Sequence, residues 1–296
     1  MQILRTMMFV PGNAPSMLRD AAIYGADYLM FDLEDAVAIS EKDAARDLVS
    51  QALSSLDYSS TKVAVRVNAL NTIYGELDVS AVVKAGADSI RMPKTETPQD
   101  VIDMDNLITK IEQENNIPVG KTKIIAAIES PLGAHNAFDI ATSSPRLFGI
   151  AIGAEDFVTS MKTTRSKDGI ELLFARSQVL HAARAAGIYA LDTVFANVND
   201  EETFRKEVQL IKQLGFDGKS IVNPRQIDIV NEIFTPTEAE INKSIRIIAA
   251  AKEGEEQGLG VVSLDGYMID KPIIERAERV LALASAAGID TGGSHE

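Results

Sequence analysis

Two short apolar runs, at residues 124–128 and 147–152, constrain the fold of this 296-residue chain most strongly. No charged residue interrupts either run, which is typical of strands that are buried on both faces of a parallel sheet. A Pro-Leu-Gly segment turns the chain between them, and residues 134–141 have the length and apolar spacing of a short helix. The stretch therefore predicts one β-α-β unit with neighbouring parallel strands.

Both apolar runs end in acidic residues. Glu129 follows the first run, and Glu155 and Asp156 follow the second. Ligands of α/β folds bind at the carboxyl ends of the strands, where we expect Glu129 and Asp156 to lie. Two carboxylates with no strand histidine nearby favour a hard ion such as Mg²⁺, which usually keeps waters and takes further ligands from the substrate. The alternative is that both acids cap the helices that follow them.

The same alternation of strand and helix patterns continues along most of the chain. Strand patterns occur at residues 7–10, 28–33, 62–68, 89–93, 124–128, 147–152, 189–193 and 218–222. This repetition predicts an α/β fold, a (β/α)₈ TIM barrel within residues 1–235. A doubly wound open sheet is the alternative, but the chain has no Gly-x-Gly-x-x-Gly or Walker sequence. Polar residues also recur at the strand ends all round, at Asp35, Arg66, Lys94, Glu129, Asp156, Asp192 and Asn223.

The pattern changes after Pro236, and we interpret residues 236–296 as a C-terminal helical extension of the barrel. A helix is expected at 237–257, a short apolar run at 261–264 and a last helix at 272–287. The loop between them holds a turn at Asp265-Gly266 and a further acid, Asp270.

Composition excludes several kinds of partner and chemistry. The net charge is 29 − 43 = −14, which disfavours nucleic acid and anionic membrane surfaces, so an anionic substrate needs local Arg, Lys or a metal. The chain has no cysteine, which excludes disulfides and thiolate sites and favours a reducing, cytoplasmic location. We expect neither a transmembrane helix nor a signal peptide. Because there are only three histidines, acid–base chemistry should fall to carboxylates.

Arg66 is a charged residue within an apolar strand pattern. Strand alternation places it on the face of Ala64 and Asn68, opposite the valines of the same run. One interpretation is a structural ion pair with Asp32, Glu34 or Asp35. The other is a bidentate clamp on a substrate carboxylate or on a developing enolate.

Lys94 and the helical histidines offer weaker signals. A lysine at the end of the fourth strand could form a Schiff base with a carbonyl substrate, although a solvated or ion-paired lysine is the simpler interpretation. His135 and His181 fall within helical patterns without the spacing of metal ligands, so we expect both to be structural.

Several blocks spread along nearly the whole chain point to one family. The blocks are RTMMFVPG (5–12), FDLEDAV (31–37), VRVN (65–68), RMPKTE (91–96), AAIES (126–130), GAEDF (153–157), GFDGKSIVNPRQI (215–227) and SLDGYMIDKP (263–272). Taken together they resemble the citrate lyase β-subunit branch of the malyl-CoA/citramalyl-CoA lyase superfamily. The Val-Asn-Pro of the eighth-strand block is more similar to this branch than to relatives with His-Pro there.

The resemblance implies a Mg²⁺-dependent barrel lyase and gives roles to four residues. Glu129 and Asp156 would be the metal ligands, Arg66 would hold the substrate and stabilise its enolate, and Glu129 would also touch the substrate. Asp270 would be the catalytic acid–base residue, supplied by a neighbouring subunit. One departure is Tyr267, because similar proteins often carry a lysine there that could hold the thioester arm.

The resemblance also implies a reaction and partners. The expected reaction cleaves a citryl thioester, citryl-ACP, to oxaloacetate and an acetyl thioester. The expected partners are an acyl carrier protein subunit and an acyl-transferase (α) subunit of a citrate lyase complex, with the chain itself a homo-oligomer. The alternatives are a malyl-CoA or citramalyl-CoA lyase activity, a Schiff-base aldolase that uses Lys94, and a non-catalytic subunit.

Overall fold

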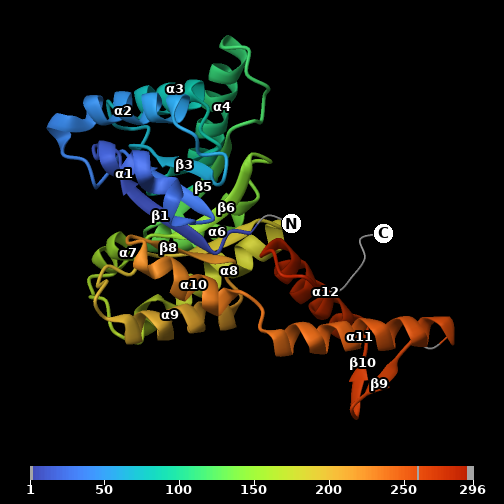
Figure 1. Cartoon of the computed structure of the whole chain (residues 1–296). Helices are drawn as coiled ribbons and strands as arrows, with labels where there is room; N and C mark the ends of the chain where they lie inside the picture. The colour runs from blue at the N-terminus through green and yellow to red at the C-terminus, as the bar shows by residue number, and fades with distance from the viewer. Residues whose placement is uncertain (1–2, 259, 292–296) are drawn as a thin grey trace. The chain divides into compact units, whose positions relative to one another are not determined.

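Eight parallel strands close into a barrel in the computed structural model, which describes residues 3–258 and 260–291 (Figure 1). The strands follow one another in chain order, and β8 pairs with β1 to close the ring, with Met7 opposite Ser220. The predicted (β/α)₈ barrel is therefore confirmed. The strands are β1 Thr6–Pro11, β2 Tyr28–Asp32, β3 Lys62–Arg66, β4 Ser89–Met92, β5 Lys123–Ile128, β6 Leu147–Ile152, β7 Tyr189–Asp192 and β8 Gly218–Ile221.

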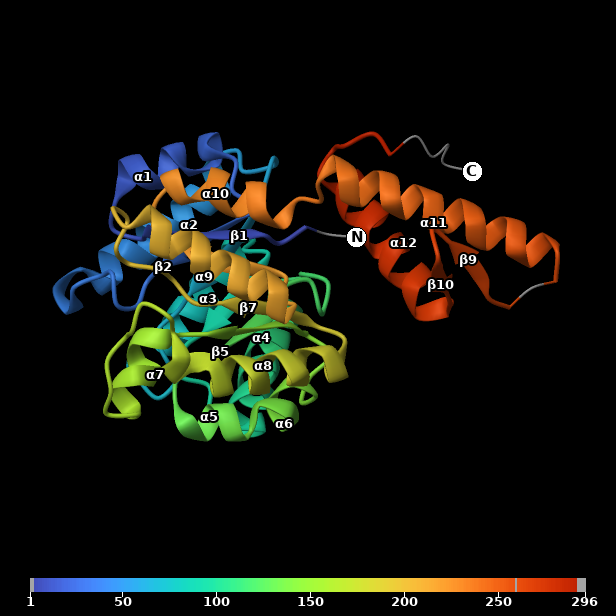
Figure 2. The ribbon, with the colours of Figure 1, turned by 90° about the horizontal axis from the view of Figure 1, so that it is seen from below.

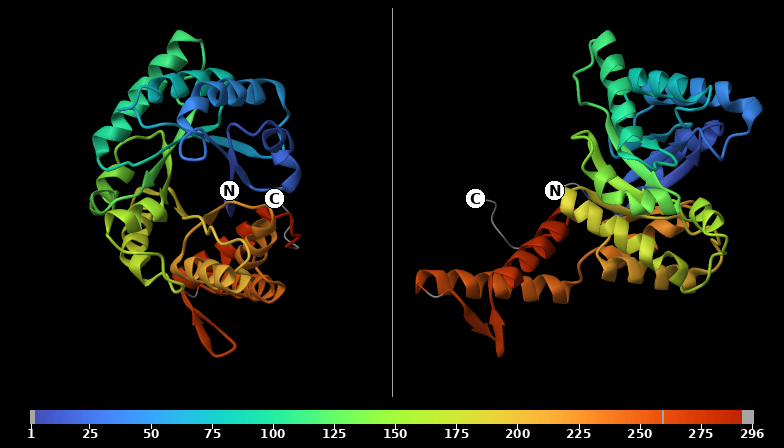
Figure 3. Two further views of the ribbon diagram at one scale, coloured as in Figure 1. Left: turned by 90° about the vertical axis from the view of Figure 1, so that its left-hand side faces the viewer. Right: turned by 180° about the vertical axis from the view of Figure 1, so that it is seen from behind.

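Helices surround the strands as an outer ring (Figure 3, left). They are α1 Pro15–Asp20, α2 Lys42–Ser55, α3 Gly75–Ala85, α4 Pro98–Glu114, α5 Pro131–His135, α6 Ala137–Ala141, α7 Ala154–Ser160, α8 Leu173–Ala186, α9 Glu201–Leu214 and α10 Arg225–Phe234. The helix expected at 134–141 is a pair of short helices that begins earlier, at Pro131. The α7 helix was not predicted, because a seven-residue helix is too short to show a helical period.

Local sequence rules account for several helix ends. Thr97 caps α4 through a capping box with Asp100, which satisfies backbone donors that the first turn leaves unpaired. Gly187 and Gly215 end α8 and α9 in the left-handed conformation, at φ 71° and 110°. At both glycines the helix stops and the chain turns back into the next strand, β7 after α8 and β8 after α9.

The barrel interior is filled by apolar side chains from all round the ring. The interior cluster contains Leu4, Met7, Tyr28, Met30, Ala64, Ile125, Ala151 and Leu191. Residues 124–128 of β5 are buried without exception, because one face meets this interior and the other meets the helices. Arg66 lies two residues beyond Ala64 on the same strand and therefore shares its inward face.

Contacts divide the described chain into two compact units, one of residues 4–230 and one of Ile3 with residues 231–258 and 260–291. The predicted boundary, between residues 235 and 236, falls after α10, whereas the observed division falls within that helix.

The second unit has its own apolar core. Its elements are α11 Glu238–Glu256, the antiparallel hairpin of β9 Val262–Leu264 and β10 Tyr267–Ile269, and α12 Lys271–Ala286. Figure 2 shows α11 and α12 side by side, with the hairpin beside them. Ile247, Ile269 and Ala277 are the buried centre of this core. Over residues 3–258 and 260–291, no helix is both long enough and apolar enough to cross a bilayer.

Candidate active site

A cavity of about 420 Å³ opens among the carboxyl ends of the barrel strands. Three of the four predicted site residues line it: Arg66, Glu129 and Asp156. The fourth, Asp270, belongs to the second unit and is not among the residues that line the cavity. The β-α-β unit predicted from the two apolar runs therefore brings its acids to one place.

Glu129 follows the last residue of β5 and is only 4% exposed. Its Oε2 accepts a hydrogen bond from the backbone N–H of Lys94 at 3.1 Å. Burial raises the pKa of Glu129 to about 7, and the carboxylates of Glu34 and Asp156 add to the rise against the opposing effect of Arg91 and Arg66. Helix capping does not explain this acid, because Ser130 supplies the side-chain cap of α5.

Close packing keeps the Glu129 side chain in place. A Cβ built on Gly153 would lie 2.6 Å from Cγ of Glu129, so a larger residue there would force the Glu129 side chain to move. Lys94, whose N–H faces Glu129, has a φ of 49°, a left-handed conformation that is uncommon for a residue with a side chain. Local backbone geometry on both sides is therefore adapted to the carboxylate.

Asp156 lies in the first turn of α7 and is half-buried. No side chain caps this helix, although an acid in the first turn still interacts favourably with the helix dipole. Nζ of Lys94 approaches Asp156 to 3.9 Å. Asp156 also contributes to the raised pKa of Glu129, which shows that the two carboxylates repel each other.

Arg66 makes the ion pairs that one interpretation of the sequence predicted. Its Nε and Nη2 donate to Asp32 at 2.7 and 2.6 Å, and Nη1 lies 3.0 Å from Glu34 and 3.3 Å from Asp35. Burial raises the pKa of Asp32, but the hydrogen bonds from Arg66 outweigh it, so the pKa of Asp32 is lowered. The guanidinium is thus held by carboxylates and at the same time faces the cavity.

Lys94 does not have the environment of a Schiff-base lysine. Its side chain is 52% exposed, and Nζ lies 3.4 Å from Glu34. Burial lowers the pKa of Lys94, but the combined negative charges of Glu34, Asp156 and Asp35 outweigh it, so the pKa of Lys94 is raised. A nucleophilic lysine needs the opposite shift, which counts against the aldolase alternative.

The carboxylates fit a magnesium ion that keeps several waters. Across the parts of the chain that the structure describes, no group of three or more His, Asp or Glu residues forms a closed metal cage. Glu129 and Asp156 remain as two oxygen-donor side chains on one cavity, which is the number that Mg²⁺ commonly takes from a protein. A cation beside Glu129 would offset the burial that, together with the neighbouring carboxylates, raises the pKa of Glu129.

A sequence model of the HpcH/HpaI aldolase/citrate lyase family matches residues 5–224, which include all eight barrel strands. The chain belongs to this family. It is 55% identical over 295 residues to the citrate lyase subunit beta of Leuconostoc mesenteroides subsp. cremoris, covering 99% of this chain and 98% of the relative. It is also 36% identical to a (3S)-malyl-CoA thioesterase of Cereibacter sphaeroides (strain ATCC 17025 / ATH 2.4.3), with 95% of each chain covered.

A solved structure of the family shares the fold. The protein CitE of Mycobacterium tuberculosis, in complex with magnesium, acetoacetate and coenzyme A, superimposes with a TM-score of 0.77 at 29% identity. The match covers 95% of this chain and 98% of that one. The resemblance inferred from the sequence blocks is confirmed.

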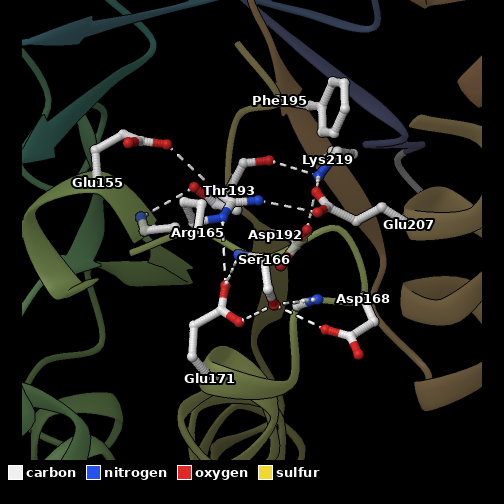
Figure 4. Close-up of polar contacts among 12 residues, drawn as sticks. Glu155, Arg165, Ser166, Asp168, Glu171, Asp192, Thr193, Phe195, Glu207 and Lys219 are labelled. Atoms are coloured by element: carbon white, nitrogen blue, oxygen red, sulfur yellow. Dashed lines mark hydrogen bonds and ion pairs between the residues drawn. The ribbon is translucent and has the colours of Figure 1, made fainter. Parts of the chain in front are cut away.

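In this member of the family, Lys219, Asp192 and Glu207 form a buried ionic network next to Thr193, a residue that lines the cavity (Figure 4). Nζ of Lys219 donates to Asp192 at 2.8 Å, to Glu207 at 2.5 Å and to the carbonyl of Thr193 at 2.8 Å. Thr193 Oγ1 in turn accepts the backbone N–H of Ala154, the first residue of α7, at 3.0 Å. The network therefore fixes the start of the helix that carries the proposed metal ligand.

Sequence reasoning missed this network and one further arginine of the family fold. Asp192 was recognised only as a polar strand end, and Arg176 lies in the first turn of α8, an outer helix on which a charge is usually solvent-exposed. Arg91 falls in a quoted sequence block but received no role, although it lines the cavity. Strand alternation could have found Arg91, since it pairs with Arg66 in the register of β3 and β4.

Asp270 has a structural role within its own unit. Its Oδ1 accepts the backbone N–H of Ile273 at 3.3 Å and so caps α12. Tyr267, three residues earlier, is 74% exposed. The acid–base role of Asp270 stays a prediction, as does the effect of tyrosine at position 267.

Proposed function

We propose that this chain is a Mg²⁺-dependent carbon–carbon lyase that cleaves a citryl thioester to oxaloacetate and an acetyl thioester, as the β subunit of a citrate lyase. The observation that carries the proposal is the cavity at the strand ends, which gathers Arg66, Glu129 and Asp156. The relative named citrate lyase subunit beta, at 55% identity over nearly the whole chain, supports the choice of substrate.

Glu129 and Asp156 would hold the metal. Magnesium at this position supplies Lewis-acid polarisation of the substrate's oxygen atoms. The two side chains come from consecutive β-α units, so the rigidity of β5 and β6 fixes their separation. Glu129 is buried and its pKa is raised to about 7, so a cation beside it would stabilise its charged form.

Arg66 would bind the substrate and stabilise its enolate. Asp32 holds Nε and Nη2, so Nη1 is the group that can exchange an internal partner for a substrate oxygen. The partner to exchange is Asp35, whose side chain is 59% exposed and whose contact is long at 3.3 Å. One such donor to a developing oxyanion is worth about 2–4 kcal/mol of transition-state stabilisation.

The cleavage needs no net gain or loss of protons or electrons. The substrate hydroxyl gives up its proton and becomes the ketone of oxaloacetate, and the electron pair of the broken bond passes to the thioester as an enolate. The enolate carbon then takes up one proton to become the methyl group of the acetyl thioester. We propose that Asp270 of a neighbouring copy serves as the acid–base residue that delivers this proton.

The quaternary partners follow from the same proposal. An acyl carrier protein subunit would present the thioester, an acyl-transferase (α) subunit would load it, and self-association would bring Asp270 to a neighbour's cavity. The cytoplasmic location stays a prediction from the cysteine-free sequence.

The test is cleavage of a citryl thioester, followed by enzymatic detection of oxaloacetate, with Mg²⁺ and with EDTA. We expect activity that EDTA abolishes and Mg²⁺ restores, and loss of activity in Asp156→Ala with an unchanged circular dichroism spectrum. Asp139→Ala is the matched control, because it removes an exposed acid from the first turn of another short helix, α6. Activity that persists in EDTA would contradict the proposal, and metal binding without any turnover would favour a non-catalytic subunit.

A further inference from the structure

Arg91 is a buried cation that lacks an anionic partner within the described part of the chain. It lies on β4, is 3% exposed and lines the cavity that holds Glu129 and Asp156. Its Nη1 donates to two neutral atoms across the barrel, Ser220 Oγ at 3.3 Å and Met7 Sδ at 3.9 Å. Its Nε has no hydrogen-bond acceptor among the residues that the structure describes.

Other buried cations of the same barrel are paired. Arg146 donates to Asp105 and lies 3.0 Å from Glu112, while Arg176 and Lys219 both donate to Asp192. Such pairing is the rule, since an unpaired buried charge costs several kcal/mol. Burial lowers the pKa of Arg91 to about 10 against the opposing charge of Glu129, and Arg66 adds to the fall; Arg91 is still charged at neutral pH.

The carboxylates around the cavity are already committed to other partners. Asp32 is held by Arg66, and Glu129 accepts its hydrogen bond from Lys94 without forming an ion pair with Arg91. The lining includes five acids and only two guanidinium groups, those of Arg66 and Arg91. The site that a substrate with two free carboxylates enters is therefore negatively charged. Of the two lining cations, Arg91 is the one that forms no ion pair with a described carboxylate.

The substrates of this reaction class differ in one substituent. The carbinol carbon carries a hydrogen in a malyl thioester, a methyl group in a citramalyl thioester and a carboxymethyl group in a citryl thioester. Only the last adds a second free carboxylate, and an apolar site would reject it because a buried carboxylate must be paired. A guanidinium suits this group well, because its planar fork can donate two parallel hydrogen bonds.

We propose that Arg91 binds the carboxymethyl carboxylate of the substrate and thereby selects citryl over malyl and citramalyl thioesters. The inference rests on the proposed function for its substrate class and on the buried, unpaired guanidinium for its residue. The oxaloacetate product carries the same carboxylate, so Arg91 should also distinguish oxaloacetate from pyruvate.

The first experiment measures binding and needs no turnover. The affinities of oxaloacetate and of pyruvate are measured by calorimetry in the presence of Mg²⁺, for the wild-type chain and for Arg91→Met, Arg91→Lys and Ser220→Ala. We expect the wild type to prefer oxaloacetate and Arg91→Met to lose this preference by on the order of 100-fold, the cost of removing one partner of a buried charge pair. Arg91→Lys should lose less, and Ser220→Ala, which perturbs the same layer but keeps the cation, should keep the preference.

The second experiment measures the ratio of kcat/KM for citryl to that for citramalyl thioester, which should fall in Arg91→Met in parallel with the binding preference. An unchanged ratio and an unchanged binding preference in both Arg91 variants would overturn the inference, as would equal losses for both ligands. A wild type that binds oxaloacetate selectively through Arg91 but cleaves no citryl thioester would refute the proposed function alone. Thermal unfolding checks the fold of Arg91→Met, which exchanges an unpaired charge for an apolar side chain of similar length.

Discussion

The buried network behind the cavity rim gives the sharpest test of how the barrel is stabilised. Asp192 is fully buried and accepts three hydrogen bonds, from Arg176 Nε at 2.8 Å, Arg176 Nη2 at 3.0 Å and Lys219 Nζ at 2.8 Å. Burial alone would raise the pKa of Asp192, but the charges of Lys219 and Arg176 hold it below its usual range. The substitution Asp192→Asn removes the charge and keeps the shape.

The loss of stability expected for Asp192→Asn follows from the charges that remain in the network. In the buried centre of the network, Arg176 and Lys219 carry two positive charges and Asp192 and Glu207 two negative ones. Glu207 is also paired with the less buried Arg165, which contacts Glu155 and Glu171 as well. Asp192→Asn therefore leaves one positive charge in excess at the buried centre. An uncompensated buried charge costs about 3–5 kcal/mol. For a domain of this size, each kcal/mol lowers Tm by about 2–4 °C, so we expect Tm to fall by roughly 6–20 °C.

Thermal unfolding followed by far-ultraviolet circular dichroism measures this, since the chain has no tryptophan. The double variant Asp192→Asn/Lys219→Met restores neutrality and should be more stable than Asp192→Asn alone. Glu202→Gln is the control, because it removes an acid from an exposed ion pair with Lys206 and should leave Tm unchanged. A fall in Tm below about 3 °C for Asp192→Asn, or no recovery in the double variant, would refute the reasoning.

Three further outcomes are expected. Arg146 and two backbone N–H groups lower the pKa of Glu112 despite its burial, so the stability that this carboxylate contributes is present above about pH 4–5 and is lost as pH falls. In urea unfolding measured from pH 3 to 7, the midpoint should therefore fall less at low pH in Glu112→Gln than in the wild type. Gly153→Ala should push Glu129 aside and weaken Mg²⁺ binding by roughly 10–100-fold in calorimetry, whereas unchanged affinity would count against Glu129 as a ligand. Borohydride with oxaloacetate or pyruvate should trap no adduct on Lys94, and mass spectrometry of a modified Lys94 would revive the aldolase alternative.

The strands could be predicted from the sequence because they are uninterrupted apolar runs. The proposed metal ligands could be predicted because they are the acids that follow the ends of two of these runs. Both faces of β5 and β6 are buried, so their apolar runs are uninterrupted, and the first polar residue after β5 is Glu129 itself. Arg66 was found for the same reason, as a charge that breaks an apolar strand. The sequence could not decide whether Arg66 forms an ion pair or a substrate clamp, because that depends on the distances from its guanidinium to the carboxylates around it.

The rest of the site depends on contacts between residues far apart in the chain. Arg176 meets Asp192 only because β7 follows α8 back into the barrel, and Lys219 reaches both Asp192 and Glu207 from β8. Nothing in the local pattern around Arg176 distinguishes it from a solvated helix residue. The missing acidic partner of Arg91 is likewise visible only once its surroundings in the barrel are known.

The distribution of paired and unpaired charges connects stability with function in this barrel. Asp32 is neutralised by Arg66, and Asp192 by Arg176 and Lys219, so these groups are satisfied within the fold. Glu129 and Arg91 are buried at the cavity without an ion pair among the described residues, and burial raises the pKa of Glu129 and lowers that of Arg91. Since these two groups form no ion pair with each other, each can take a further partner, a cation beside the carboxylate and an anion beside the guanidinium. A metal ion and a carboxylate-rich substrate meet both needs at once, which explains why an acidic chain can hold an anionic substrate at all.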